Sequence, residues 1–77
     1  MHYTDLRAAL RQEPFVPFRL HLTDGRWLDV PNRRWMIVMR EESSVGLPNE
    51  TGEPETGIII WNDQIKHIEM LSLPAVT

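Results

Sequence analysis

The chain has 77 residues, a net charge of -3 and no cysteine. This length allows a single domain with a thin core, and the lack of cysteine excludes disulfides and thiolate metal sites. No apolar run approaches the roughly 20 residues of a membrane span, and the start MHYTDLRAAL does not read as a signal peptide, so we expect a cytoplasmic protein that does not enter a membrane.

The acidic residues are concentrated in one segment. Residues 41–57 contain five glutamates and no lysine or arginine, so the rest of the chain is weakly basic. This small excess is far from the strongly basic surface typical of nucleic-acid binders. Charge alone therefore argues against RNA or DNA as the partner.

The N-terminal pattern predicts a helix over residues 4 to about 13. Thr4 is a typical N-cap, Asp5 complements the positive helix end, and apolar residues follow at helical spacing before Pro14 ends the helix. The two prolines of residues 14–18 then favour an extended connector.

Five apolar segments predict five strands. Residues 18–22 and 27–30 alternate between apolar and polar side chains around Asp24 and Gly25, the turn residues of a hairpin. Further strands are predicted over residues 35–40, 58–61 and 65–71, with a polar corner at 62–64 before the last.

The sequence therefore predicts a single mainly β domain over residues 1–77, an N-terminal helix followed by a five-stranded, strongly bent antiparallel small barrel. Residues 41–57, rich in Gly, Pro and Glu, are predicted to form a mobile loop, either solvated or used for binding. The predicted interior, with the two leucines that seal one end given last, consists of Phe18, Leu20, Leu22, Leu28, Val30, Ile37, Ile60, Ile68, Met70, Leu6 and Leu10.

The residues that could perform catalysis are few. His2, His21 and His67 lack the spacing of a metal site, and Ser43 and Ser44 lack the strand-turn-helix setting of a nucleophile. We therefore expect no enzymatic activity, no metal and no cofactor.

A candidate interaction surface consists of aromatic and basic residues. Its members are Trp27, Arg33, Arg34, Trp35, Arg40 and Trp61. Trp27 and Trp61 fall on the polar side of their strands, which leaves three interpretations: burial near a corner of the barrel, contact with another chain, or stacking on bases.

Two stretches resemble the Sm-like family, whose members share the small-barrel architecture with SH3-like domains. Residues 60–68 (IWNDQIKHI) keep the three isoleucines of Ile-Arg-Gly-x-x-Ile-x-x-Ile, and residues 22–26 (LTDGR) resemble Leu-x-Asp-Gly-Arg. The resemblance implies the barrel and RNA binding. However, Trp61-Asn62 replaces the Arg-Gly of the RNA pocket, and no Asp-x-x-x-Asn follows Val30, so the pocket is not carried over.

The first third is similar to a family of small uncharacterised bacterial proteins, planctomycete-like, with Leu-Arg-x-x-Leu, Gln-x-Pro-Phe-x-Pro-Phe and His-Leu-x-Asp-Gly-Arg. Leu6, Arg7 and Leu10 match the first motif, and residues 12–18 and 21–26 match the others. This resemblance implies fold and source but no activity.

The sequence leads to a first functional hypothesis and an alternative. The first is a non-enzymatic binding or assembly module that associates with itself or with another protein through exposed strand edges, for which residues 35–40 and 65–71 are the candidates. The alternative is RNA binding through Arg33, Arg34 and Arg40 with aromatic stacking.

Overall fold

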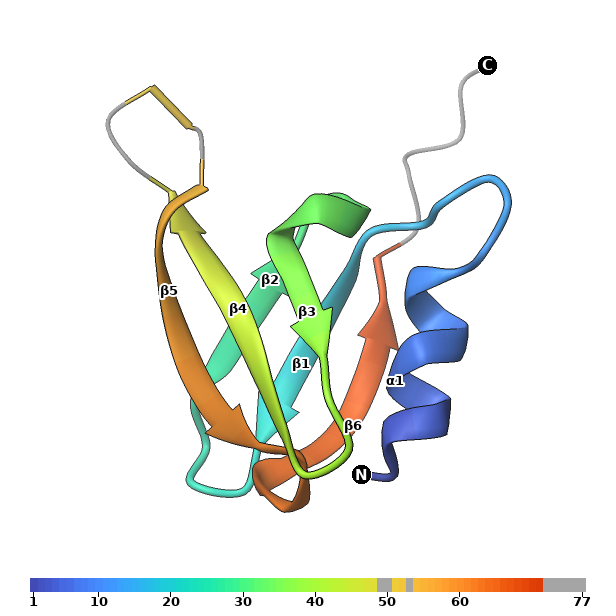
Figure 1. The fold of residues 1–77 in the computed structure, drawn as a ribbon, viewed down its shortest axis with the longest axis vertical. Helices are drawn as coiled ribbons and strands as arrows, with labels where there is room; N and C mark the ends of the chain where they lie inside the picture. Colours follow the sequence, from blue (N-terminus) through green and yellow to red (C-terminus); the bar gives the residue numbers. More distant parts are fainter. Residues whose placement is uncertain (49–50, 53, 72–77) are drawn as a thin grey trace.

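A computed structural model describes residues 1–48, 51–52 and 54–71. Figure 1 shows the helix and the strands of the described part of the chain. In chain order the elements are α1 (Tyr3–Leu10), β1 (Phe18–Leu22), β2 (Trp27–Val30), η1 (Arg33–Trp35), β3 (Met36–Val38), β4 (Glu42–Pro48), β5 (Pro54–Trp61), η2 (Asn62–Gln64) and β6 (Ile65–Met70).

The predicted N-terminal helix is confirmed with different ends. Its N-cap is His2, whose Nδ1 accepts the Thr4 backbone N–H at 3.3 Å, whereas the sequence predicted Thr4 in this role. The helix ends at Leu10, three residues early, where the Arg33 side chain donates to the Leu10 carbonyl at 2.8 Å. Leu6 is fully buried and anchors the helix on the core.

The first sheet has the strand order β2-β1-β6, with both pairs antiparallel. Burial alternates along β1 as the sequence predicted, with Phe18, Leu20 and Leu22 inside. The β1–β2 turn contains Gly25 at a φ of 92°, a left-handed conformation that favours glycine.

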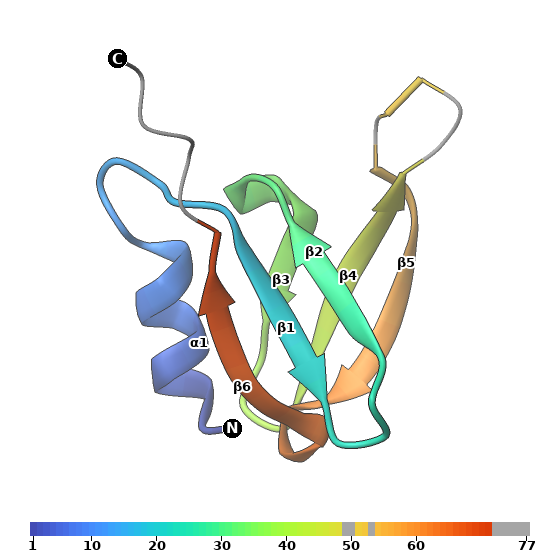
Figure 2. The same ribbon diagram turned by 180° about the vertical axis from the view of Figure 1, so that it is seen from behind.

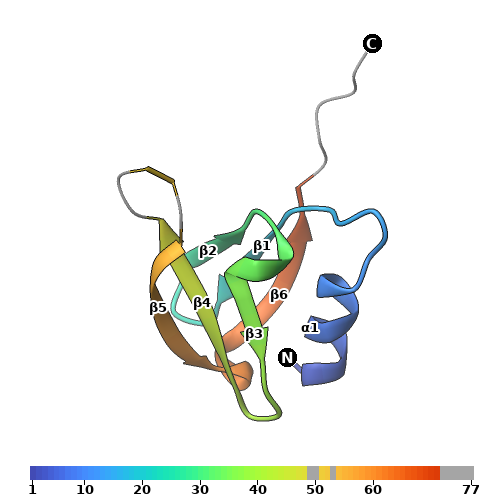
Figure 3. The ribbon, with the colours of Figure 1, turned by 45° about the horizontal axis from the view of Figure 1, so that its top comes forward.

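The second sheet has the order β3-β4-β5, also antiparallel throughout. Its inner side chains include Met36, Val45 and Ile60, which are buried against the first sheet in one common core. Figures 1 and 2 show this sheet on one side of the molecule and β2-β1-β6 on the other. Helix α1 contacts β3 and lies beside β3 and β6 (Figure 3).

The predicted five-stranded barrel is wrong. The described residues form two three-stranded sheets that do not close into a barrel. Between β2 and β3 the chain turns through η1, capped by the Asn32 side chain, which accepts the Arg34 N–H at 3.1 Å. This turn interrupts the ladder that a closed barrel needs to continue from one sheet to the next.

The loop predicted over residues 41–57 is also wrong for most of its length. Strand β4 and the start of β5 lie within this segment, and residues 49, 50 and 53 of it lie outside the described residues. Local sequence preference does not predict strand β4, because ESSVGLP is rich in residues that are also common in loops. Pairing on both sides, with β3 and β5, provides the backbone hydrogen bonds that local propensity does not.

The predicted interior needs two corrections and several additions. Ile37 and Met70, predicted inside, are exposed. Leu28, Ile68 and Leu10 are only partly buried against the core. The core also contains side chains that the sequence did not place there: Trp35, Met36 and Val45.

Candidate protein-contact surface

The outer face of β3-β4-β5 is built from three cross-strand rows. Ile37, Ser44 and Ile59 are register partners and form the middle row. At one end, Glu42 pairs with Trp61, and its carbonyl accepts the Met39 backbone N–H at 3.0 Å. At the other end, Gly46 pairs with Gly57. Side chains alternate between faces along a strand, so these rows share one face.

This outer face carries four large exposed apolar side chains, which we call the apolar face: Ile37, Met39, Ile59 and Trp61. Their exposed fractions are 64, 43, 68 and 57%. Antiparallel sheets of small proteins normally present polar residues on the solvated face. A cluster of this kind is typical of a surface that another molecule covers.

The outer face of β2-β1-β6 is different in character. Arg19 donates to both carboxylate oxygens of Asp29, at 2.7 and 3.2 Å, and its guanidinium lies 4.0 Å from the centre of the Trp27 ring. His21 bonds to Glu69 at 2.8 Å and stacks on the ring of His67. These polar side chains are therefore paired with one another on this face.

The two exposed tryptophans therefore differ. Trp27 is 53% exposed but its ring is covered on one side by Arg19. Among the described residues, none forms an aromatic or cation–π pair with Trp61. Of the two, Trp61 has the ring that neither an aromatic nor a cationic side chain of the described residues covers.

A buried polar network fixes the end of the sheet that carries Trp61. Asn62, only 3% exposed, donates from Nδ2 to the carbonyls of Met39 at 2.8 Å and Arg40 at 3.1 Å. Its Oδ1 accepts the hydroxyl of the fully buried Ser43 at 2.6 Å. The Asn62 side chain thus ties the β3–β4 turn to η2 and sets the positions of Met39 and Trp61.

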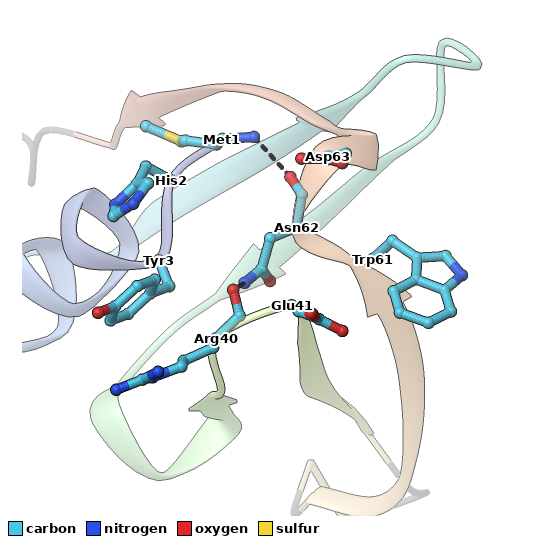
Figure 4. Close-up of a pocket in the computed structure, with 8 residues that line it drawn as sticks. All are labelled: Met1, His2, Tyr3, Arg40, Glu41, Trp61, Asn62 and Asp63. Atoms are coloured by element: carbon cyan, nitrogen blue, oxygen red, sulfur yellow. Dashed lines mark hydrogen bonds between the residues drawn. The ribbon is translucent and has the colours of Figure 1, made fainter.

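A hollow of about 390 Å³ lies beside this network (Figure 4). It is lined by Met1, His2, Tyr3, Arg40, Glu41, Trp61, Asn62 and Asp63. The Met1 amino group donates to the carbonyl of Asn62 at 2.6 Å and to that of Ile65 at 3.1 Å. In Figure 4 the Arg40 and Trp61 side chains project to opposite sides of Asn62, so they do not converge on a common point.

A second hollow, of about 440 Å³, lies between β2 and β4. Its lining is mainly apolar and consists of Trp27, Leu28, Asp29, Pro31, Trp35, Gly46 and Leu47. Both oxygens of its one carboxylate, Asp29, already bind Arg19. This hollow offers apolar walls and no charged group free to fix the orientation of a ligand.

The six residues predicted as an interaction surface do not form one cluster. Trp27 and Trp35 line the second hollow, and Arg40 and Trp61 line the first. Trp35 is 7% exposed, which places it in the core. The Arg33 guanidinium donates to the carbonyls of Leu10 and Gln12 and to Glu13 Oε1 at 2.7 Å.

Arg34 is exposed beside Arg33 in η1.

Met39 and Ile59 were not predicted as contact residues, and Ile37 was predicted to lie inside. A usable signal was present, because the runs MIVM and IIIW are apolar at consecutive positions. A strand with this pattern carries apolar side chains on both faces.

Among the residues that the structure describes, two surface groups have shifted pKa values. The pKa of Asp24 lies below its ordinary value, mainly because the carboxylate accepts the Arg26 backbone N–H at 2.9 Å and then because it accepts the Arg26 guanidinium at 2.7 Å. The pKa of Arg19 is raised, first by its hydrogen bond to Asp29. Both shifts come from local hydrogen bonds on the surface, and in each case the carboxylate also forms an ion pair with the arginine.

The described residues contain neither a metal site nor a membrane-spanning helix. No cluster of His, Asp or Glu suited to a metal ion occurs in the part of the chain that the structure describes. No helix within the same residues is long and apolar enough to cross a bilayer.

Comparison with protein-family models, curated proteins and solved structures finds no match to this chain. The family resemblances noted in the sequence therefore stay predictions.

Proposed function

We propose that this chain is a non-catalytic assembly module that contacts a protein partner through the apolar face of β3-β4-β5. The observation that carries the proposal is the group of four exposed apolar side chains, Ile37, Met39, Ile59 and Trp61, on one face of one sheet. Their exposure leaves roughly 500 Å² of apolar surface in water, which is within the range of patches that are often functional.

The chemistry of the face supports an apolar protein surface as the partner. Across its three rows Glu42 is the one charged residue, and Ser44 is the one hydroxyl. A complementary surface is therefore apolar and nearly uncharged, as in the centre of protein interfaces. Phosphate-bearing ligands require cations, which these rows do not contain.

RNA binding remains a prediction from the sequence, and we do not advance it as a second function. Of the groups assigned to it, Arg33 donates to backbone carbonyls and Glu13, and Trp35 is buried. Arg40 lies in the β3–β4 turn, in a different region from η1.

A photo-crosslinking experiment tests the proposal. A benzophenone amino acid is placed at position 59 of the full chain in the cells that naturally produce it, and at Lys66 as the control. Lys66 is exposed on β6, in the other sheet. We expect discrete protein adducts from position 59, with contact sites identified by mass spectrometry, and few from position 66. Equal yields at the two positions would refute the proposal.

A further inference from the structure

We infer that the partner is a second copy of this chain, packed face to face about a two-fold axis so that Trp61 of each copy lies over Gly46 and Gly57 of the other. This inference rests on the proposed function, since it assigns the occupant of the same apolar face. It adds a specific arrangement of residues that a different partner would not share.

The shape of the face along its strands supports this arrangement. Ile37 and Ile59 stand in the middle row, and Trp61 and Met39 stand at one end. At the opposite end the row consists of two glycines, Gly46 and Gly57, which carry no side chain. The face is therefore raised at one end and low at the other, where the Ser44 hydroxyl is the side-chain atom nearest to Gly57.

A two-fold axis brings these unlike ends together. If the axis lies between the two sheets and runs along the middle row, perpendicular to the strands, each strand runs opposite to its counterpart in the facing sheet. Trp61 lies two residues from Ile59 in one direction, and Gly57 lies two residues from it in the other. Both offsets are about 7 Å, so the indole of one copy meets the glycine row of its partner. Contacts made twice in this reciprocal way define an isologous interface.

The area that two copies would bury between them also supports this arrangement. Each copy contributes roughly 500 Å² of apolar side-chain surface, so the pair buries about 1,000 Å² before any flanking residues are counted, close to the lower limit for a specific interface. The core of the monomer is thin, because ten apolar residues are buried in the described part of the chain. Small domains of this kind commonly gain stability by association.

The first part of the experiment measures self-association of the purified full chain. Sedimentation velocity and native mass spectrometry should detect a dimer at or below about 500 µM, since an interface near the lower size limit is a weak one. Trp61→Ala should weaken the dimer at least tenfold, as truncation of a well-packed aromatic contact does. Trp27→Ala is the matched control, since Trp27 is exposed to a similar extent on the other sheet, and it should leave the dimer unchanged.

The second part tests the reciprocal contact. The space above the glycine row is filled by Gly57→Leu. Since a Cβ at Gly57 would lie 2.9 Å from Ser44 Oγ, this change is combined with Ser44→Ala, and Ser44→Ala alone is the control. The filled chain should not dimerise with itself. Mixed with the Trp61→Ala chain, it should form a heterodimer, because the intact indole then meets the intact glycines and the truncated residue meets the leucine. We expect this heterodimer to exceed both homodimers about tenfold.

The outcomes separate the inference from the proposed function. A wild-type chain that stays monomeric at 500 µM, or a mixture without excess heterodimer, overturns the second-copy assignment. Adducts of position 59 with a different protein would then leave the proposed function standing, whereas a monomer without such adducts removes both. If the Gly57 variant does not fold, the pair of tryptophan variants decides: loss from Trp61→Ala alone supports the inference, and equal or absent loss overturns it.

Discussion

Replacement of Asn62 by alanine should remove most of the stability of this domain. Three side-chain hydrogen bonds are lost, to Ser43 and to the carbonyls of Met39 and Arg40. At a net value of about 1 kcal/mol for each bond, the loss amounts to about 3 kcal/mol. A domain of this length typically has only about 3 to 5 kcal/mol from its core, so the variant should be close to unfolded at 37 °C.

Urea unfolding monitored by circular dichroism measures this loss as a change in the free energy of unfolding. Asp63→Ala provides the matched control, because Asp63 is exposed in the same 3-10 turn and should change stability by less than about 0.5 kcal/mol. Ser43→Ala should cost about 1 kcal/mol, and a double-mutant cycle with Asn62→Ala should show a coupling of similar size. A loss below about 1 kcal/mol for Asn62→Ala, or strict additivity of the two changes, would refute this reasoning.

Two further predictions concern Arg33 and Asp24. Arg33→Ala should lower the free energy of unfolding by roughly 1 to 2 kcal/mol, because the end of α1 loses its charged donor. Arg33→Lys should not restore the lost stability, because an ammonium cannot form the forked contact. Full rescue by lysine in urea unfolding would contradict this prediction. Asp24 has a folded-state pKa below the ordinary value of about 3.9, so its contribution to stability is present above that pH and is lost as the pH falls through the folded-state pKa. The stability difference between wild type and Asp24→Asn should therefore shrink in acid, and a difference that is constant between pH 2 and 7 would contradict the assigned hydrogen bonds from Arg26 to the carboxylate.

The candidate contact surface was only partly predictable. Trp61 was identified because it falls on the side of its strand opposite Ile58 and Ile60. Ile37 was placed on the wrong side, because an apolar run such as WMIVM does not indicate which of its two faces is buried. That choice depends on the pairing of β3 with β4, which aligns Ile37 with Ser44 and turns Met36 inward. Arg33 looked like a surface cation, and its role became visible only when the end of α1 was placed beside it.

Features that depend only on neighbouring residues could be derived from the sequence. The helix near the N-terminus, the alternating burial of β1 and the turn at Gly25 all follow from local spacing and backbone preference. The tertiary structure alone decided which segments pair at long range. Ser43 and Asn62 are polar residues typical of loops, yet they are buried because each satisfies the other across 19 residues of chain. Long-range pairing of this kind also formed two separate sheets in place of a barrel and left the apolar face exposed, since local preferences do not specify the partner of a strand.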